Sequence, residues 1–338
     1  MIISRTPFRI SFFGGGTDYP AWYLREGGAV LSTTIDKYLY MACRYLPPFF
    51  EMRHRIVWSK IENVWKIEDI QHPAIREGLR FLGFDDSRGL DIHYHADLPA
   101  RSGMASSSAF AVGLINALHA LRGHRVSKQE MALKAIELER DVLHETVGSQ
   151  DQTAVANGGL NRIDFLQTGE IRVEPITIAG ARISDFESHL MLFYTGISRH
   201  ASQVAADVVA NIPKKEATLR EMLQMVDTAE GILTGTGSLD ELGHLLHESW
   251  QLKRSLSRRI TNSNIDGIYE SARKAGALGG KLLGAGESGF LLFFVPPDGR
   301  AAIKMALESL LHVPFGFSRQ GSTIIHYDPE EYNAGTTR

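Results

Sequence analysis

The sequence has few of the features that mark secreted, membrane or nucleic-acid-binding proteins. Its 338 residues include one cysteine, Cys43, so no disulfide forms within the chain, as is usual in a reducing compartment. No apolar run approaches the ~20 residues that span a bilayer, and the start of the chain lacks the apolar stretch of a signal peptide. The net charge of −3 provides no basic stripe for a nucleic-acid backbone. We therefore expect a cytoplasmic protein with no nucleic-acid or membrane partner.

Internal repeats and low-complexity tracts are also absent, and no Gly-Lys-Ser/Thr ending of a Walker phosphate loop is found. What the chain does have is an ordinary globular composition, with 43% hydrophobic and 22% charged residues. At this length two domains with a cleft between them are expected. We predict a boundary near residues 180–188, which divides the chain into domains 1–183 and 184–338.

Periodicity predicts mixed α and β structure in both halves. Strands are expected around residues 8–12, 29–45, 55–65, 89–96, 158–174, 189–194, 290–295 and 322–327. Helices are expected at residues 105–121, 128–146, 199–212, 216–232, 239–256, 265–275 and 300–311. The segment 105–121 is apolar nearly all round and is predicted to be buried.

The segment PARSGMASSSA, residues 99–109, has the composition of a phosphate-binding loop. Small residues let a polyphosphate approach the backbone, and the unpaired amides at a helix start attract anions. Ser106, Ser107 and Ser108 add hydroxyl groups for phosphate or metal. The alternative is a glycine-containing turn capped by serine before a core helix.

Two carboxylates after this loop are candidates for magnesium binding and proton transfer. Glu139 falls on the apolar stripe of the predicted helix 128–146, where an ionised group needs a cation or hydrogen-bond donors. An ion pair with Arg140 is the alternative. Asp151 follows Gly-Ser, where an aspartate is commonly a turn residue or a helix cap.

Glycine clusters near both ends of the chain complete the pattern. The first, GGGTD, holds Gly14, Gly15, Gly16, Thr17 and Asp18, and taken alone it is a turn with an aspartate cap. The second, GAGESG, holds Gly284 and Gly286 and precedes a predicted strand. Lys281 before it could pair with phosphate, and a lysine at an exposed turn is the alternative that we favour.

Together these three segments resemble, in order and across nearly the whole chain, the three signatures of the GHMP kinases. The second signature is met by Pro99, Ser102, Gly103, Met104, Ala105, Ser106, Ser107 and Ser108, which the resemblance assigns to ATP. It also implies Ser106 and Glu139 as Mg²⁺ ligands, Asp151 as catalytic base and Arg9 as its helper. The resemblance assigns sugar binding to Gly15, Gly16, Thr17 and Asp18. It assigns Gly284 and Gly286 to a loop that closes on the nucleotide phosphates. Glu287 and Ser288 stand where the family commonly has glycine.

The fold implied is α+β, with an N-terminal domain resembling ribosomal protein S5 domain 2 and a ferredoxin-like C-terminal domain. Gly14–Gly16 replaces the Gly-Glu-His usual in galactokinases, and this start is similar to that of the branch acting on D-glycero-D-manno-heptose 7-phosphate. ATP and Mg²⁺ are the expected cofactors, and phosphorylation of the anomeric hydroxyl is the expected reaction.

Further expectations concern the edges of the site. Ser198 and Arg199, at a predicted helix start, are candidates for the phosphate on the sugar, and Trp58 for a wall of the adenine site; each can equally be structural. A fucokinase-like or other anomeric sugar kinase, and a non-catalytic sugar or ATP sensor on the same scaffold, are the alternative functions. A homo-oligomer is compatible with the sequence.

Overall fold

The computed structural model of the protein describes residues 1–196 and 201–329, without the side chains of residues 201 and 202. Its strands are β1 (Ile2–Phe13), β2 (Gly28–Tyr45), β3 (His54–Val57), β4 (Ile61–Val64), β5 (Leu90–Ala96), β6 (Leu160–Phe165), β7 (Ile171–Pro175), β8 (Leu190–Tyr194), β9 (Gly279–Leu282), β10 (Phe290–Phe294), β11 (Leu311–Val313), β12 (Phe317–Ser318) and β13 (Thr323–Tyr327). Its α-helices are α1 (Pro20–Glu26), α2 (Pro73–Phe81), α3 (Ser106–Leu121), α4 (Lys128–Glu137), α5 (Gln150–Asn157), α6 (Gly180–Ser188), α7 (Ala201–Asn211), α8 (Glu216–Thr234), α9 (Asp240–Leu256), α10 (Ser263–Lys274) and α11 (Arg300–Ala306).

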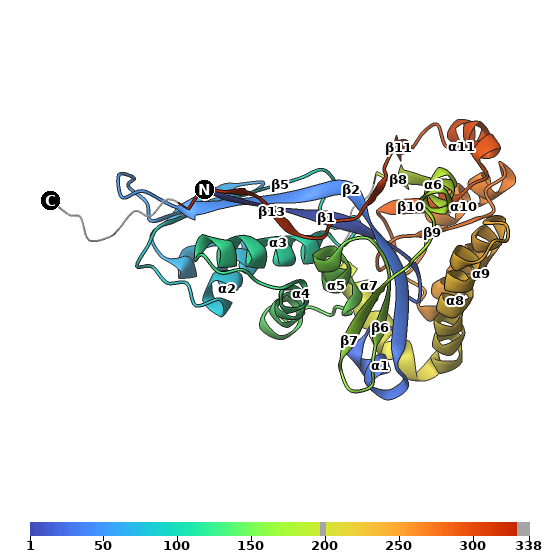
Figure 1. Cartoon of the computed structure of the whole chain (residues 1–338), viewed down its shortest axis with the longest axis horizontal. Helices are drawn as coiled ribbons and strands as arrows, with labels where there is room; N and C mark the ends of the chain where they lie inside the picture. The colour runs from blue at the N-terminus through green and yellow to red at the C-terminus, as the bar shows by residue number, and fades with distance from the viewer. Residues whose placement is uncertain (197–200, 330–338) are drawn as a thin grey trace.

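The first sheet is organised around the long strand β2. Its strand order is β13-β1-β2-β5-β3-β4, and β6 and β12 also pair with β2. The first part of β2 pairs with β6 and the last part with β5, while β1 pairs with β2 over most of its length. This strand therefore extends from the covered part of the sheet to the β6–β7 hairpin (Figure 1).

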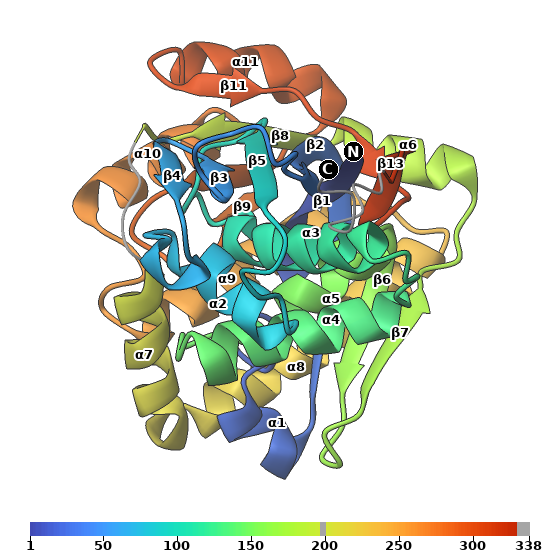
Figure 2. The same ribbon diagram turned by 90° about the vertical axis from the view of Figure 1, so that its left-hand side faces the viewer.

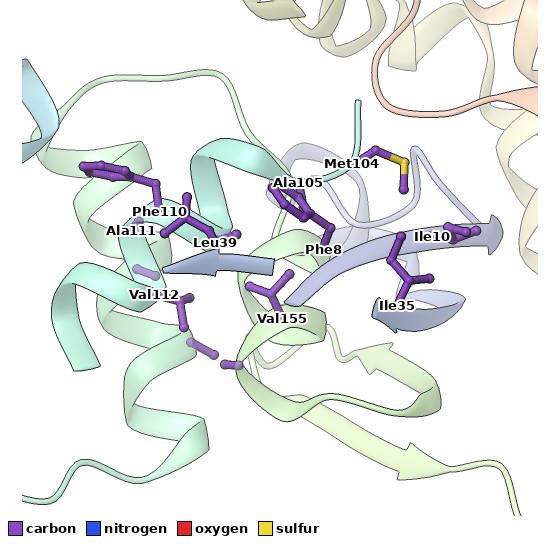
Figure 3. Packing of buried hydrophobic residues seen from close by; sticks show 14 of the residues in the cluster. Phe8, Ile10, Ile35, Leu39, Met104, Ala105, Phe110, Ala111, Val112 and Val155 are labelled. Carbon is purple, nitrogen blue, oxygen red and sulfur yellow. The ribbon is translucent and has the colours of Figure 1, made fainter. Parts of the chain in front are cut away.

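Helices α2 to α5 cover one face of this sheet, with α3 directly against it (Figures 1 and 2). Nearly every residue of α3 is buried, which confirms the prediction for residues 105–121. A Cβ atom on Gly113 would lie 3.0 Å from Thr6 Oγ1, and Ser4 Oγ donates a hydrogen bond of 2.8 Å to Gly113 O. This close approach packs the middle of α3 against β1. Before the helix start, Arg9 N–H donates to Met104 O at 3.2 Å, and Met104 and Ala105 lie near Phe8 and Ile10 (Figure 3).

The second sheet has the strand order β11-β8-β10-β9, and all its pairs are antiparallel. Read along the chain, one strand, a group of helices, two strands, one helix and a last strand follow one another, which is the ferredoxin-like arrangement. The structure thus agrees with the ferredoxin-like prediction for this half.

An aromatic cluster joins the two sheets. The ring of Phe12 from β1 lies 5.1 Å from Phe186 of α6, and Phe186 lies 6.3 Å from Phe294 of β10 and 5.5 Å from Phe317 of β12. Strands β12 and β13 then return to the first sheet, where β13 pairs with β1. We retain a division near residue 183 as a proposal, with residues 317–327 belonging to the first unit.

One predicted element is wrong in extent. The helix expected over residues 128–146 is regular only to Glu137, continues as a π-helical turn over Leu138–Val142, and then gives way to a loop. The π-helical turn contains the buried Glu139, whose carboxylate accepts hydrogen bonds from Ser108 of α3 and Gln152 of α5. Within residues 1–196 and 201–329, no helix is long and apolar enough to cross a membrane.

Candidate active site

A cavity of about 540 Å³ lies between the two units of the protein. Its wall includes the first glycine cluster, the phosphate loop, the loop 144–148 and α5 from the first unit. Helices α7 and α9, Lys281 and the third glycine loop complete the wall from the second unit. The three sequence signatures, which are far apart along the chain, therefore meet at one cavity.

Arg9 and Asp151 form the central pair of this cavity. Arg9 Nε and Nη2 donate to the two carboxylate oxygens of Asp151 at 2.8 and 2.7 Å, and Nη1 donates to Gly103 O at 2.7 Å. The Arg9 side chain is 4% exposed and that of Asp151 is 27% exposed. Because a bidentate arginine fixes the plane of a carboxylate, Asp151 is held in one orientation while part of it faces the cavity.

The phosphate loop and the third glycine loop contact each other through their backbones. Gly103 has φ of +80° and Gly284 has φ of +74°, and a Cβ on Gly284 would lie 2.3 Å from Gly103 Cα. A Cβ on Gly289 would lie 2.2 Å from Ser102 O. No side chain fits at these positions, so the second unit supports the shape of the phosphate loop.

Ala105, immediately before α3, also has a left-handed backbone, with φ of 64°. This conformation costs a non-glycine residue roughly 1–2 kcal/mol. It turns the chain abruptly so that α3 starts at the cavity, with Ser106, Ser107 and Ser108 on the wall. Strain of this kind is characteristic of functional loops.

Glu139 is a buried carboxylate with one unsatisfied oxygen. Ser108 Oγ donates to its Oε2 at 2.8 Å, and Gln152 Nε2 donates to the same oxygen. Its Oε1 has no hydrogen-bond partner among the described residues. Burial raises the pKa of Glu139 to about 7, although hydrogen bonds from Ser108, Gln152 and Ser107 oppose the rise.

These features fit a magnesium ion. The orphaned Oε1 of Glu139 is a hard oxygen ligand that lacks a cation, and magnesium in phosphotransferases commonly takes only one or two carboxylates together with substrate phosphates. Ser108 donates to Glu139, and Ser106 Oγ accepts a hydrogen bond of 3.0 Å from the Arg101 backbone N–H. Both serines line the cavity, and the assignment of Ser106 as a magnesium ligand stays a prediction.

Asp18 occupies a tight position beside the start of α5, where Ser149 N–H donates to its carbonyl at 2.9 Å. Gly16 N–H donates to Asp18 Oδ1 at 2.9 Å, and a Cβ on Gly148 would lie 1.8 Å from Asp18 Oδ2. Burial, with a contribution from the charge of Asp151, raises the pKa of Asp18. An acceptor carboxylate in this setting is suited to hydroxyl donors from a ligand.

The remaining predicted residues are distributed around the cavity. Arg9, Gly15, Gly16, Asp18, Gly103, Ala105, Ser106, Ser107, Ser108, Asp151 and Gly284 line it. Thr17 is buried beside it, and its hydroxyl donates to Gly14 O and Ala29 O. Pro99, Ser102, Met104, Glu139 and Gly286 adjoin lining residues without being part of the lining. Ser198 and Arg199 lie outside the described residues.

Trp58 lies away from the cavity wall. Its ring packs edge-on against His72 at 5.0 Å, and its Nε1 donates to Glu62 Oε1 at 2.7 Å. Its assignment to adenine stays a prediction.

Several lining residues were missed by reasoning from the sequence. Tyr19, Lys253 and the loop 144–148 carry no local signal that distinguishes them from surface residues. The expectation for Lys281 is wrong, because this lysine is 4% exposed and its Nζ donates to Phe12 O at 2.7 Å. Its position on β9, next to a glycine loop that closes the cavity, was the only available hint.

Fold and site together define a kinase of small molecules, and the chain belongs to the GHMP kinase family. The family models for the "GHMP kinases N terminal domain" and "GHMP kinases C terminal" match residues 70–159 and 228–308. This establishes a phosphotransferase acting on a sugar or other alcohol, as its three signatures predicted.

Among individual relatives, the chain is similar to the D-glycero-alpha-D-manno-heptose 7-phosphate kinase of Campylobacter jejuni. The two are 27% identical over 95% of this chain and 97% of the relative. The L-fucokinase/L-fucose-1-P guanylyltransferase of Bacteroides fragilis is 24% identical, over 90% of this chain and 35% of that longer protein. The crystal structure of a D-glycero-D-manno-heptose 1-phosphate kinase from Bacteroides thetaiotaomicron has the same fold, with a TM-score of 0.78, 23% identity and coverage of 95% and 98%.

Proposed function

We propose that the protein transfers the γ-phosphoryl group of ATP to the anomeric hydroxyl of D-glycero-D-manno-heptose 7-phosphate, giving the 1,7-bisphosphate. Such a product would feed nucleotide-activated heptose synthesis for surface polysaccharide in the cytoplasm. The heptose specificity is supported by the Campylobacter jejuni relative and by the Gly14–Gly16 cluster in place of Gly-Glu-His.

The observation that best supports phosphoryl transfer is that Arg9 has two different hydrogen-bond partners in the site. One guanidinium binds both the Asp151 carboxylate and Gly103 O of the phosphate loop. The candidate base is therefore held at a fixed distance from the loop that receives the phosphates, as proton transfer and in-line displacement require.

Within this proposal each residue has a defined task. Asp151 accepts the proton of the attacking hydroxyl, and Asp18 accepts hydrogen bonds from sugar hydroxyls. Glu139 and Ser106 would hold magnesium, which would neutralise phosphate charge when bound. The left-handed loop at 101–105 and the start of α3 present backbone amides to the phosphates.

The test is a substrate panel with magnesium-ATP, measuring ADP release. We expect turnover with the heptose 7-phosphate and at least tenfold lower kcat/KM with the unphosphorylated heptose, L-fucose and galactose. Preference for L-fucose would favour the fucokinase-like alternative instead. Binding of sugar and ATP without ADP release would favour the sensor.

Asp151→Asn tests the base. Because the amide cannot accept the proton, kcat should fall by roughly 10²–10⁴-fold while the Kd for ATP stays close to that of the wild type. Asp141→Asn is the matched control, since Asp141 is exposed and paired with Arg140. Wild-type kcat in Asp151→Asn would remove Asp151 from the base role.

A further inference from the structure

Lys253 is a cation of the cavity wall to which the proposed reaction gives no task. It lies on α9, and its side chain reaches the cavity from the second unit. Its Nζ donates to Gly284 O at 2.6 Å and to Leu282 O at 3.1 Å. An ammonium group has three donors, so two are engaged by the third glycine loop and one is left for the cavity.

The position of Lys253 is close to the point of phosphoryl transfer. Gly284, whose carbonyl it binds, touches Gly103 of the phosphate loop, and Gly103 O accepts from Arg9. The charges that act on Lys253 are those of Arg9 on β1, Asp151 on α5 and Asp18 before α1. Lys253 also faces Lys281 on β9.

Arg9 and Lys281, the two cations whose charges act on Lys253 or are acted on by it, are each held by other partners. Arg9 uses three of its N–H donors on Asp151 and Gly103 O. Lys281 is 4% exposed, binds Phe12 O, and has a pKa well below its usual range because of burial and the nearby Lys253 and Arg9. Within the described part of the chain, Lys253 forms no ion pair with a carboxylate.

We infer that Lys253 is a catalytic residue that donates a hydrogen bond to the transferring phosphoryl group, while Arg9 serves to position Asp151. The inference rests on the proposed kinase function but not on any particular sugar. In the step, the acceptor oxygen forms a bond to the γ-phosphorus and the bond from that phosphorus to the β,γ-bridging oxygen breaks. The bridging oxygen leaves with its electron pair on ADP, the hydroxyl proton passes to Asp151, and Lys253 keeps its proton throughout.

Lys253→Met removes this donor. We expect kcat to fall by about 100-fold, the size of effect seen when one donor to a transition-state oxygen is lost, with the Kd for ATP changed less than threefold. Arg254→Met is the matched control, because the next residue on α9 carries the same charge but pairs with Asp266 at 3.1 Å. A kcat for Lys253→Met within threefold of the wild type would overturn the inference.

The pH dependence separates this role from a structural one. Burial and the charge of Arg9 lower the pKa of Lys253 to about 8, against the opposing charges of Asp151 and Asp18. The wild-type kcat/KM should therefore fall as pH rises through about 8, and in Lys253→Arg this decrease should move above pH 10, because arginine stays protonated. An unchanged alkaline decrease in Lys253→Arg would overturn the inference, even if Lys253→Met fails to fold.

A measurement without sugar distinguishes the failure of this inference from failure of the proposed function. Aluminium fluoride bound next to magnesium-ADP mimics the phosphoryl group in the transition state of transfer. In the wild type and in Arg254→Met, aluminium fluoride should lower the Kd for ADP. In Lys253→Met the factor by which it lowers that Kd should be at least tenfold smaller. An equal factor in all three proteins would overturn the role of Lys253, whereas absence of turnover on every sugar would count only against the proposed reaction.

Discussion

Gly148 is the residue whose lack of a side chain most directly serves the site. A Cβ at this position would lie 1.8 Å from Asp18 Oδ2, and Asp18 has no room to withdraw because it is 2% exposed. Gly148→Ala should therefore displace the carboxylate and raise the KM for the sugar by at least tenfold, as steady-state kinetics can measure.

Gly231→Ala is the control for that substitution. Gly231 is exposed in the interior of α8 with no atom within 4 Å of its Cβ position, so alanine should stabilise the protein by about 0.5–1 kcal/mol without affecting KM. An unchanged KM in Gly148→Ala would mean that Asp18 does not bind the sugar.

The ionisation of Glu139 in the site affects the stability of the folded protein. Its pKa of about 7 lies above the ordinary value of 4.5, so the folded protein without metal is stabilised at low pH. That stabilisation is lost as pH rises from about 4.5 to about 7, at a cost on the order of 3 kcal/mol.

Glu139→Gln should remove this cost. Without metal the variant should be more stable than the wild type at pH 8 but not at pH 4.5, as urea denaturation can show. Added magnesium-ATP should stabilise only the wild type, because the variant lacks the carboxylate ligand. Equal magnesium-ATP stabilisation of both proteins would exclude Glu139 as a ligand.

Individual residues differ in how far the sequence predicted them. Glu139 was found because a carboxylate interrupted an apolar stripe, and its burial confirms that reasoning. Ser106, Ser107 and Ser108 were predicted together as hydroxyl groups of the site, but the sequence did not indicate that Ser108 is the one that donates to Glu139. Lys253 and Tyr19 were missed because only tertiary packing brings them to the cavity.

At the scale of elements, the third glycine loop accommodates a residue other than glycine in a left-handed conformation. Glu287 has φ of 64°, its N–H donates to Ile260 O at 3.0 Å, and its own carbonyl accepts from Asn262. Glutamate therefore takes a left-handed backbone conformation at a position where the family commonly has glycine.

This conformation can be tested with two substitutions. Glu287→Gly should change the free energy of unfolding by less than about 1 kcal/mol, because relief of strain offsets the greater entropy of the unfolded chain. Glu287→Val should destabilise by roughly 1–2 kcal/mol, since branching at Cβ disfavours positive φ. If chemical denaturation found valine as stable as glutamate, the backbone at 287 would not be left-handed.

The extents of some elements also depended on contacts that the sequence does not reveal. Helical periodicity continued past Glu137, but the π turn at Leu138–Val142 ended the helix. Periodicity indicates which face of a helix is buried. It does not indicate where the backbone hydrogen bonds change from the α-helical to the π-helical pattern, as they do at Leu143 N–H and Leu138 O.

At the scale of the molecule, the two sheets share one core. Phe12, Phe186, Phe294 and Phe317 come from both units, and β12 and β13 return from the second unit to the first. We expect one unfolding transition in calorimetry, with the van't Hoff and calorimetric enthalpies equal. Two resolved transitions would show that the units unfold independently.

The resemblance of the three signatures to the family implied both fold halves, whereas the strand and helix pattern by itself indicated only mixed α and β structure. The sequence did not predict that residues 317–327 leave the ferredoxin-like unit, since a short terminal strand has the same pattern in either sheet. Pairing partners of this kind are decided by long-range contacts, such as those of Thr323 and Tyr327 with β1.

The pairing of β13 with β1 has a consequence for how the protein is made. Strand β1 is synthesised long before β13, and the phosphate loop long before Gly284 and Gly289, whose backbones support it. A nascent chain that carries every residue of the first two signatures therefore still lacks the support of its nucleotide loop, and ATP binding should begin only after residues 284–289 have left the ribosome.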